Sequence, residues 1–221
     1  MNVAKKVQKL HPVEPPVIFV DCFNTIILRT VSNRQIFHLW SEKLAARLAL
    51  PVKVIERCYR RVNYRLSRAA FLRHFITQAD FEKVLAAMQE QLKTKYPTVA
   101  EPNFVALATE LYSATETQNQ TVNQPVIDFL RAQKAAGKKI YVVSDFYCPA
   151  TTLRQWLGNL GVLDLFDDVY SSCNAGQGKA SSKLYQTLLQ RLNLAGPDVL
   201  MIGDSLWSDV WMARRRKIKT K

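Results

Sequence analysis

The chain has 221 residues, of which 31 are Lys or Arg and 18 are Asp or Glu, so its formal net charge is +13. Hydrophobic residues make up 48% of the chain, which is enough for a large core and excludes a globally disordered protein. The positive excess favours anionic partners, namely phosphorylated metabolites, nucleic acid or an acidic surface, without choosing among them. No segment approaches the roughly 18 apolar residues of a membrane span.

The cysteines do not form a metal-binding or disulfide pattern. Cys22, Cys58, Cys148 and Cys173 contain no C-x-x-C pair, and no histidines cluster with them. Zinc and a disulfide framework therefore gain little support from the sequence. We expect isolated reduced thiols in a cytoplasmic protein, because the first residues also lack the apolar segment and cleavage site of a secretory signal.

The N-terminal region is predicted to hold one strand between a basic arm and a helical block. Residues 1–16 form the expected arm, and residues 17–21 carry the continuous apolar run of a strand that is buried on both faces. From residue 32 to about residue 124 the sequence shows only helical signals, and all seven glycines lie later, between Gly137 and Gly203.

Four helices are predicted in this block. Ser32 and Gln35 match a capping box, and apolar residues follow at four-residue spacing from Ile36 to Leu48. Further helices are expected at residues 52–76, 80–95 and 102–117.

The second half alternates strands with helices. Strands are predicted at "KIYVVSD", "DDVYSS" and "DVLMIGD", and helices at 125–136, from Pro149 to about Gly158 or Gly161, at 181–193 and from about Ser208. This alternation indicates an α/β fold with a mostly parallel sheet that helices cover on both faces. We expect a core of residues 17–31 and 125–221, into which residues 32–124 are inserted as an all-helical domain.

Polar residues end three of these strands. Asp21, Ser144 with Asp145, and Asp204 all stand at predicted carboxyl ends. In an open parallel sheet these ends lie on one edge, where ligands bind. A buried aspartate is costly unless it is paired or metal-bound, and Mg²⁺ prefers such hard oxygen ligands. Each aspartate alone could simply cap the loop that follows, but three in this chain order favour a magnesium site formed by Asp21, Asp204 and a backbone carbonyl.

Four motifs in this order resemble the haloacid dehalogenase-like (HAD) hydrolase superfamily. They are "DCFNT" at residues 21–25, "VVSD" with Ser144, "GQGKASSKLY" with Lys179, and "GDSLWSD" with Asp204 and Asp209. The resemblance extends over about residues 17–217 and implies a Rossmann-like core. It also implies that the helical block is the cap that this superfamily inserts between its first two motifs.

The resemblance assigns a role to each motif residue. Asp21 would attack phosphorus and form an aspartyl-phosphate, while Thr25 and Ser144 would donate hydrogen bonds to the phosphoryl oxygens. Lys179, favoured over Lys183 by its place after a Gly-rich turn, would neutralise the phosphoryl charge. The backbone carbonyl of Phe23 and the carboxylates of Asp21 and Asp204 would bind Mg²⁺, and Asp209 and Asp145 would support the site.

The first motif departs from the phosphatase pattern at Phe23, where the acid–base aspartate of that branch would stand, and Asn24 replaces the usual Gly or Asp. General acid–base help is usually worth about 10²–10⁴-fold in rate. The enzyme is therefore expected to be slow, to act on good leaving groups, or to take its acid from the cap or the substrate. Dehalogenation is a further alternative, because that branch also carries an aromatic residue here, although the metal-binding "GD" pattern favours a phosphatase.

Arginines line one face of the second predicted cap helix. Arg57, Arg61, Arg65 and Arg68 fall at i, i+4, i+8 and i+11. A solvated helix face is the simplest interpretation, and the alternatives are a site for the remote anionic part of a substrate and, ranked lower, nucleic-acid binding. Trp207 and Trp211, four residues apart, are expected to pack in the core, with the mouth of the site as the alternative place for Trp207.

The most probable function from sequence alone is a Mg²⁺-dependent hydrolase that acts on a small phosphorylated, anionic substrate. The alternative class is a catalytically weak domain that serves binding or scaffolding in a larger protein. It is suggested by Phe23 and by the ending "ARRRKIKTK", after which either a last strand is missing or a further domain beyond Lys221 is expected.

Overall fold

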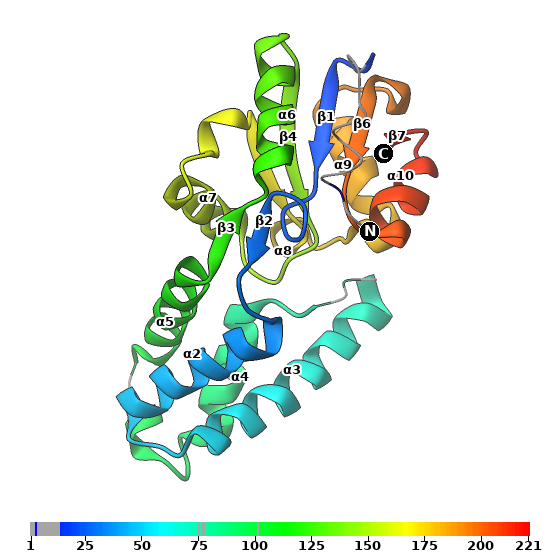
Figure 1. Ribbon diagram of the computed structural model, residues 1–221. Helices are drawn as coiled ribbons and strands as arrows, with labels where there is room; N and C mark the ends of the chain where they lie inside the picture. Colours follow the sequence, from blue (N-terminus) through cyan, green and yellow to red (C-terminus); the bar gives the residue numbers. More distant parts are fainter. Residues whose placement is uncertain (1–2, 4–13, 75, 77, 101) are drawn as a thin grey trace. The chain divides into compact units, whose positions relative to one another are not determined.

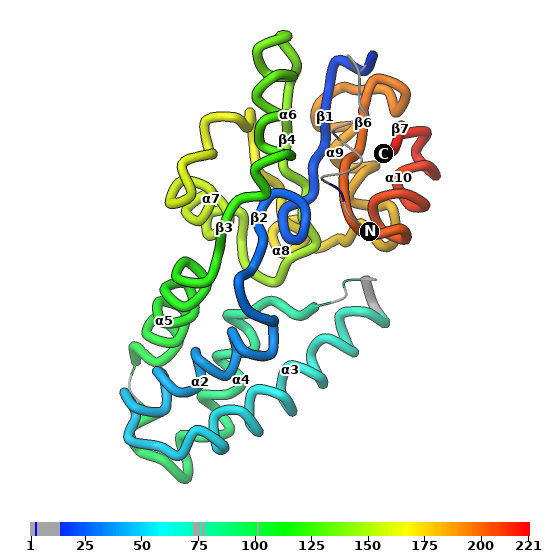
Figure 2. Tube along the Cα trace, viewed as in Figure 1, coloured from blue at the N-terminus to red at the C-terminus, as the bar shows by residue number. Residues whose placement is uncertain are grey.

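The computed structural model describes residues 3, 14–74, 76, 78–100 and 102–221 (Figure 1). The predicted arm, residues 1–16, lies almost wholly outside these residues. The described chain divides into two compact units. We call the parts within 1–28, 74–77 and 121–221 the core unit, and the parts within 29–73 and 78–120 the helical unit. Figure 2 traces the chain from β1 into the helical unit and back through β3.

The core unit is built on a five-stranded parallel sheet with the strand order β5-β4-β1-β6-β7. The strands are β1 (Val17–Val20), β4 (Lys139–Ser144), β5 (Asp168–Ser171), β6 (Val199–Ile202) and β7 (Lys219–Thr220). The predicted α/β class with a mostly parallel sheet is thus confirmed. β7 shows that the described chain does contain a last strand after "ARRRK", so the expectation of a missing strand was wrong.

The central strand fixes which side chains meet at the carboxyl edge. All four residues of β1 are buried, as its continuous apolar run requires in a sheet covered on both faces. Val20 is in register with Val142 of β4 and Ile202 of β6. The residues that follow these positions therefore emerge side by side at one edge of the sheet.

Helices cover both faces of the sheet. They are α6 (Gln124–Ala135), α7 (Ala150–Asn159), α8 (Ser172–Ala175), α9 (Lys183–Arg191) and α10 (Met212–Arg214). In Figure 1, α6 lies in front of the sheet and α9 behind it. Leu184 and Leu188 of α9 join Phe19 and Met201 in one buried cluster. Gly137 ends α6 at φ +80°, the left-handed conformation expected of a helix stop.

Two short strands were missed in the sequence. β2 (Ile27–Arg29) and β3 (Gln120–Val122) form a separate two-stranded sheet. β3 lies within residues 32–124, so the prediction of helix alone in that block was wrong at its end. Strands of three residues are too short to show an alternating pattern. The helix predicted from Ser208 also differs, because Leu206–Trp211 forms a π-helical turn that leads into α10.

The helical unit contains the four predicted helices, α2 (Asn33–Leu48), α3 (Val52–His74), α4 (Phe81–Leu92) and α5 (Phe104–Gln118). The capping box is present, since the Ser32 hydroxyl accepts a hydrogen bond from the Gln35 backbone N–H at 3.3 Å. Trp40 is fully buried and donates its ring N–H to the Ala108 carbonyl at 2.9 Å. Among the described residues, no helix combines the length and apolar character that a membrane crossing needs.

A buried ion pair ties the two ends of the helical unit together. Arg29 donates to both carboxylate oxygens of Glu116, at 3.0 and 2.7 Å. Tyr112 donates its hydroxyl to the same carboxylate, and Gln120 donates its amide at 3.0 Å. Glu116 is fully buried, so its charge depends on these donors.

Replacing the arginine of this pair should strongly destabilise the protein. Arg29→Ala leaves the Glu116 charge buried without its cation, which costs about 3–5 kcal/mol. Lys93→Ala, which removes an exposed pair with Glu90, should cost no more than about 1 kcal/mol. Urea unfolding of both variants measures the difference, and equal losses would contradict the expectation.

Candidate active site

A buried lysine joins two carboxylates at the carboxyl edge of the sheet. Lys179 stands in a short 3-10 turn (Lys179–Ser181), and its Nζ lies 2.6 Å from Oδ1 of Asp21 and 2.7 Å from Oδ1 of Asp209. Asp21 directly follows β1, and its backbone N–H donates to the Ile202 carbonyl of β6 at 2.9 Å. Asp21 and Asp209 are 158 and 30 positions away from Lys179 in the sequence, yet both accept hydrogen bonds from its ammonium group.

Backbone and side-chain donors hold Asp209 in place. Its Oδ2 accepts the Ser205 backbone N–H at 3.1 Å, and its Oδ1 lies 3.4 Å from the Ser208 hydroxyl. The carboxylate packs so closely on Gly203 that a Cβ at that position would overlap it. Glycine is therefore required at residue 203 for Asp209 to reach the lysine.

Asp145 supports the lysine through its backbone. Its Oδ1 accepts the Lys179 backbone N–H at 2.8 Å. Burial raises the pKa of Asp145, while the charge of Lys179 opposes this change. The carboxylate therefore fixes the turn that presents Lys179, and it does not contact the ammonium group in the described contacts.

Three carboxylates form a donor set for a hard cation. Asp21, Asp204 and Asp209 each offer an oxygen, and these oxygens lie within 4.8 Å of one another. Oxygen atoms of this kind are the ligands that Mg²⁺ prefers. Three carboxylates against one ammonium group also leave the cluster short of positive charge, so the residues present fit a divalent cation.

Asn24 positions one of these carboxylates, a role that sequence reasoning missed. Its Nδ2 donates to Oδ2 of Asp204 at 3.3 Å. Its backbone adopts φ +57°, which asparagine tolerates better than most residues. This turn brings the Asn24 N–H to the Ile27 carbonyl at 2.8 Å and folds the loop after Asp21 back on itself. The tolerance of asparagine for this conformation is the signal that could have revealed the turn.

The predicted hydroxyl groups also lie near this edge. Thr25 is completely buried, and its Oγ1 has no hydrogen-bond partner among the described residues. Ser144 is the last residue of β4 and is buried. A buried hydroxyl without a hydrogen-bond partner is costly. The Thr25 hydroxyl is therefore suited to donate a hydrogen bond to an oxygen atom of a ligand.

Phe23 belongs to an aromatic cluster. Its ring stacks on Phe146 with centroids 4.4 Å apart and an interplanar angle of 23°, and it meets Trp156 edge-on at 6.0 Å. Phe146 in turn stacks on Tyr147 at 4.0 Å. The side chain two residues after Asp21 thus contributes packing and no proton.

The other residues predicted for the site lie outside the cluster of carboxylates around Lys179. Arg57, Arg61, Arg65 and Arg68 are exposed on α3 in the helical unit, as a solvated face requires, and Lys183 is exposed on α9. Trp207 and Trp211 are 59% and 65% exposed, so the prediction of a core role was wrong. The π-helical turn Leu206–Trp211 buries Asp209 instead. Because a π-helix has more residues per turn than an α-helix, the four-residue spacing of the tryptophans does not place them on a buried face.

Burial and charge compete at Asp21. Burial raises its pKa to about 7, because the opposing attraction of Lys179 is smaller and Asp209 repels the charged form. Burial lowers the pKa of Lys179, but attraction by Asp209 and Asp21 outweighs it and holds that pKa well above its usual value. The ammonium group therefore stays charged, while the pKa of Asp21 lies near neutrality.

The sequence matches the family of haloacid dehalogenase-like hydrolases over residues 15–215. The chain belongs to this family. It is also 32% identical over 90 residues to a glyceraldehyde 3-phosphate phosphatase of Methanocaldococcus jannaschii, an alignment that covers 40% of this chain and 38% of that protein. The similarity thus spans less than half of the curated relative.

Solved HAD structures share the fold. YfnB of Bacillus subtilis, bound to magnesium, has a TM-score of 0.62 and 18% identity over 94% of this chain and 88% of its own. A HAD phosphatase of Thermococcus onnurineus has a TM-score of 0.62 and is 20% identical to this chain. A 2-haloacid dehalogenase of Pseudomonas syringae has a TM-score of 0.62 and is 16% identical. Both cover 92% of this chain and 84% of their own. Because a phosphatase and a dehalogenase match equally well, the fold alone does not choose between the two reactions.

The metal-free hydrolase should lose stability as the pH rises. An unfolded aspartate titrates near 3.8, whereas folded Asp21 keeps its proton up to about 7. The folded state therefore binds more protons between these values, and stability should fall there by at most about 1.4 kcal/mol per pH unit and then level off. Urea unfolding in EDTA measures the slope. Asp21→Asn should flatten it, and an unchanged slope in that variant would assign the titration to another group.

Proposed function

We propose that this HAD-like hydrolase is a Mg²⁺-dependent phosphatase that acts on small phosphorylated substrates through an aspartyl-phosphate on Asp21. The observation that carries the proposal is the buried Lys179 between Asp21 and Asp209, with Asp204 completing the carboxylate cluster. The phosphatase similarity over 40% of the chain supports the same reaction class.

The first step transfers the phosphoryl group to Asp21. A carboxylate oxygen attacks phosphorus, the new O–P bond forms, and the bond from phosphorus to the leaving oxygen breaks. Lys179 offsets the charge on the phosphoryl oxygens, to which the free hydroxyl of Thr25 and that of Ser144 donate. Water then attacks phosphorus, releases inorganic phosphate and returns Asp21 as a carboxylate.

The metal ligands of the proposal are Asp21, Asp204 and the backbone carbonyl of Phe23. A Mg²⁺ ion held by these residues would supply positive charge to the phosphoryl oxygens. Asp209 positions Lys179 by accepting a hydrogen bond from its ammonium group at 2.7 Å. Asp145 fixes the same lysine through its backbone.

The helical block 32–124 is proposed to serve as the cap, with Arg57, Arg61, Arg65 and Arg68 holding the remote anionic part of the substrate. Their common face on α3 and their positive charge support this role. The alternative is a domain of the same fold that binds without turnover, and the activity test below separates the two.

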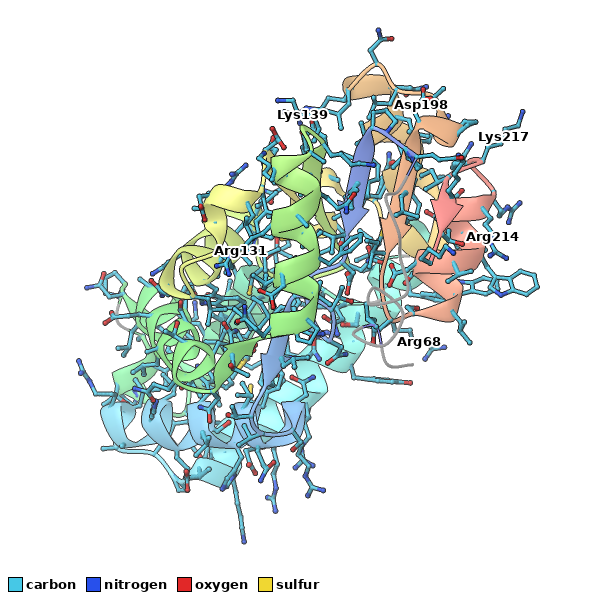
Figure 3. All side chains as sticks on the ribbon, turned by 45° about the horizontal axis from the view of Figure 1, so that its top comes forward. Arg68, Arg131, Lys139, Asp198, Arg214 and Lys217 are labelled. Atoms are coloured by element: carbon cyan, nitrogen blue, oxygen red, sulfur yellow. The ribbon has the colours of Figure 1, made fainter. Side chains whose placement is uncertain are left out.

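Phosphate release should depend on magnesium and on Asp21. With acetyl phosphate or 4-nitrophenyl phosphate, Asp21→Asn should lower turnover by at least about 10³-fold, because the nucleophile is lost. Asp198→Asn is the matched control, since this exposed aspartate precedes β6 at the opposite edge of the sheet, the end where β4 begins at Lys139 (Figure 3). A parent protein that neither turns over with magnesium nor binds beryllofluoride would favour the binding-only alternative.

The rate should depend steeply on the leaving group. Phe23 cannot protonate the departing oxygen, so a phosphate with a poor leaving group should react about 10²–10⁴-fold more slowly than the matched one with a good leaving group. Parallel kinetics of phenyl and 4-nitrophenyl phosphate measure this ratio.

Position 23 can be tested in the same assay. Phe23→Asp should reduce the leaving-group dependence, and Phe23→Leu should not, because only the first variant adds a proton donor. Similar parent rates with the two esters would show that another group supplies the proton.

A further inference from the structure

The helical unit contains a cavity of about 210 Å³ between α2 and α3, distinct from the carboxylate cluster in the core unit. Phe37 and Tyr59 form its apolar wall, and their rings stack with centroids 4.5 Å apart. Trp40 packs edge-on against both rings, so the wall is held rigidly. The cavity is smaller than the roughly 300–1,000 Å³ of pockets for drug-sized ligands. It has room for one substituted ring and not for a nucleotide.

Two arginines stand at the rim of this cavity. Arg34 lies in the first turn of α2, and Arg60 projects from α3. Both side chains are exposed, and within the part of the chain that the structure describes neither pairs with an acidic residue. Guanidinium groups match planar carboxylates with two parallel hydrogen bonds, so the rim favours an anion.

Glu56, the acidic residue among those that line the cavity, already pairs with a histidine. Glu56 lies 2.8 Å from Nδ1 of His38, and Glu42 lies 3.5 Å from Nε2 of the same ring. The hydrogen bond to Glu56 raises the pKa of His38. The negative charge of Glu56 therefore faces a histidine, while both rim arginines remain for a ligand.

We propose that this cavity binds a small aromatic carboxylate. Phe37 also stacks on Tyr112 with centroids 5.5 Å apart, so the ring of the ligand lies against the edges of Phe37 and Tyr59. The carboxylate of the ligand pairs with Arg34 and Arg60. The apolar edges of the aromatic wall favour an aromatic ring, and the two guanidinium groups favour a carboxylate, whose two oxygens accept paired N–H donors. The inference does not depend on the phosphatase proposal, because every lining residue belongs to the helical unit.

Calorimetric titration with benzoate tests the site. The double variant Arg34→Gln/Arg60→Gln should weaken benzoate binding by about tenfold or more, because it removes both charged donors. The matched control, Arg47→Gln/Lys53→Gln, removes two exposed cations from the same two helices outside the cavity. It should change the dissociation constant by less than about twofold. All four substitutions are on the surface, and thermal unfolding verifies that both proteins fold.

Two related ligands test the chemistry of the site without mutation. Benzamide lacks the charge and cyclohexanecarboxylate lacks the flat ring, so both should bind more weakly than benzoate. Equal losses in the two double variants, or no saturable benzoate binding, would each overturn the proposal. Asp21→Asn should bind benzoate like the parent, so the cavity and the catalytic proposal can fail separately.

Discussion

The buried ammonium group of Lys179 is the constraint on which the core unit depends. It is 2% exposed and lies between the carboxylates of Asp21 and Asp209. A buried cation persists only when opposite charges compensate its lost hydration. The end of β1, the 3-10 turn and the π-helical turn must therefore converge on one point. Glycine at residue 203 and the Asp145 contact to the Lys179 backbone serve this convergence, so the arrangement of the sheet and of the site follows from the same interaction.

Much of this arrangement could be read from the sequence, because local pattern and chain order determine it. The apolar run of β1 predicts a strand buried on both faces, and the alternation with helices predicts parallel neighbours. In a parallel sheet, acids that follow the strands must share an edge, which brought Asp21 and Asp204 together in advance. The Gly-rich turn before Lys179 also allowed the sequence to favour this lysine over Lys183, which is exposed in the structure.

Other features could not be predicted, because they depend on partners far away in the chain or on unusual backbone geometry. β2 and β3 have three residues each and pair only because the chain returns after about ninety residues. The Arg29–Glu116 pair spans 87 positions, so no local pattern announces it. The exposure of Trp207 and Trp211 follows from a π-helical turn, whereas the sequence spacing was interpreted as that of a regular α-helix.

The charge balance of the site bears on the choice between phosphoryl transfer and dehalogenation. Asp21, Asp204 and Asp209 together outnumber the one lysine, so the cluster repels an approaching phosphoryl group until a divalent cation compensates it. A displacement at carbon that expels a halide has no such requirement, and the extra carboxylates would only disfavour the nucleophile's negative charge. Phe23 satisfies the aromatic packing around Phe146 at the expense of a proton donor. The acid excess is therefore the feature that supports the proposed phosphoryl chemistry, and under that proposal Phe23 would restrict the enzyme to substrates whose leaving oxygen needs little help.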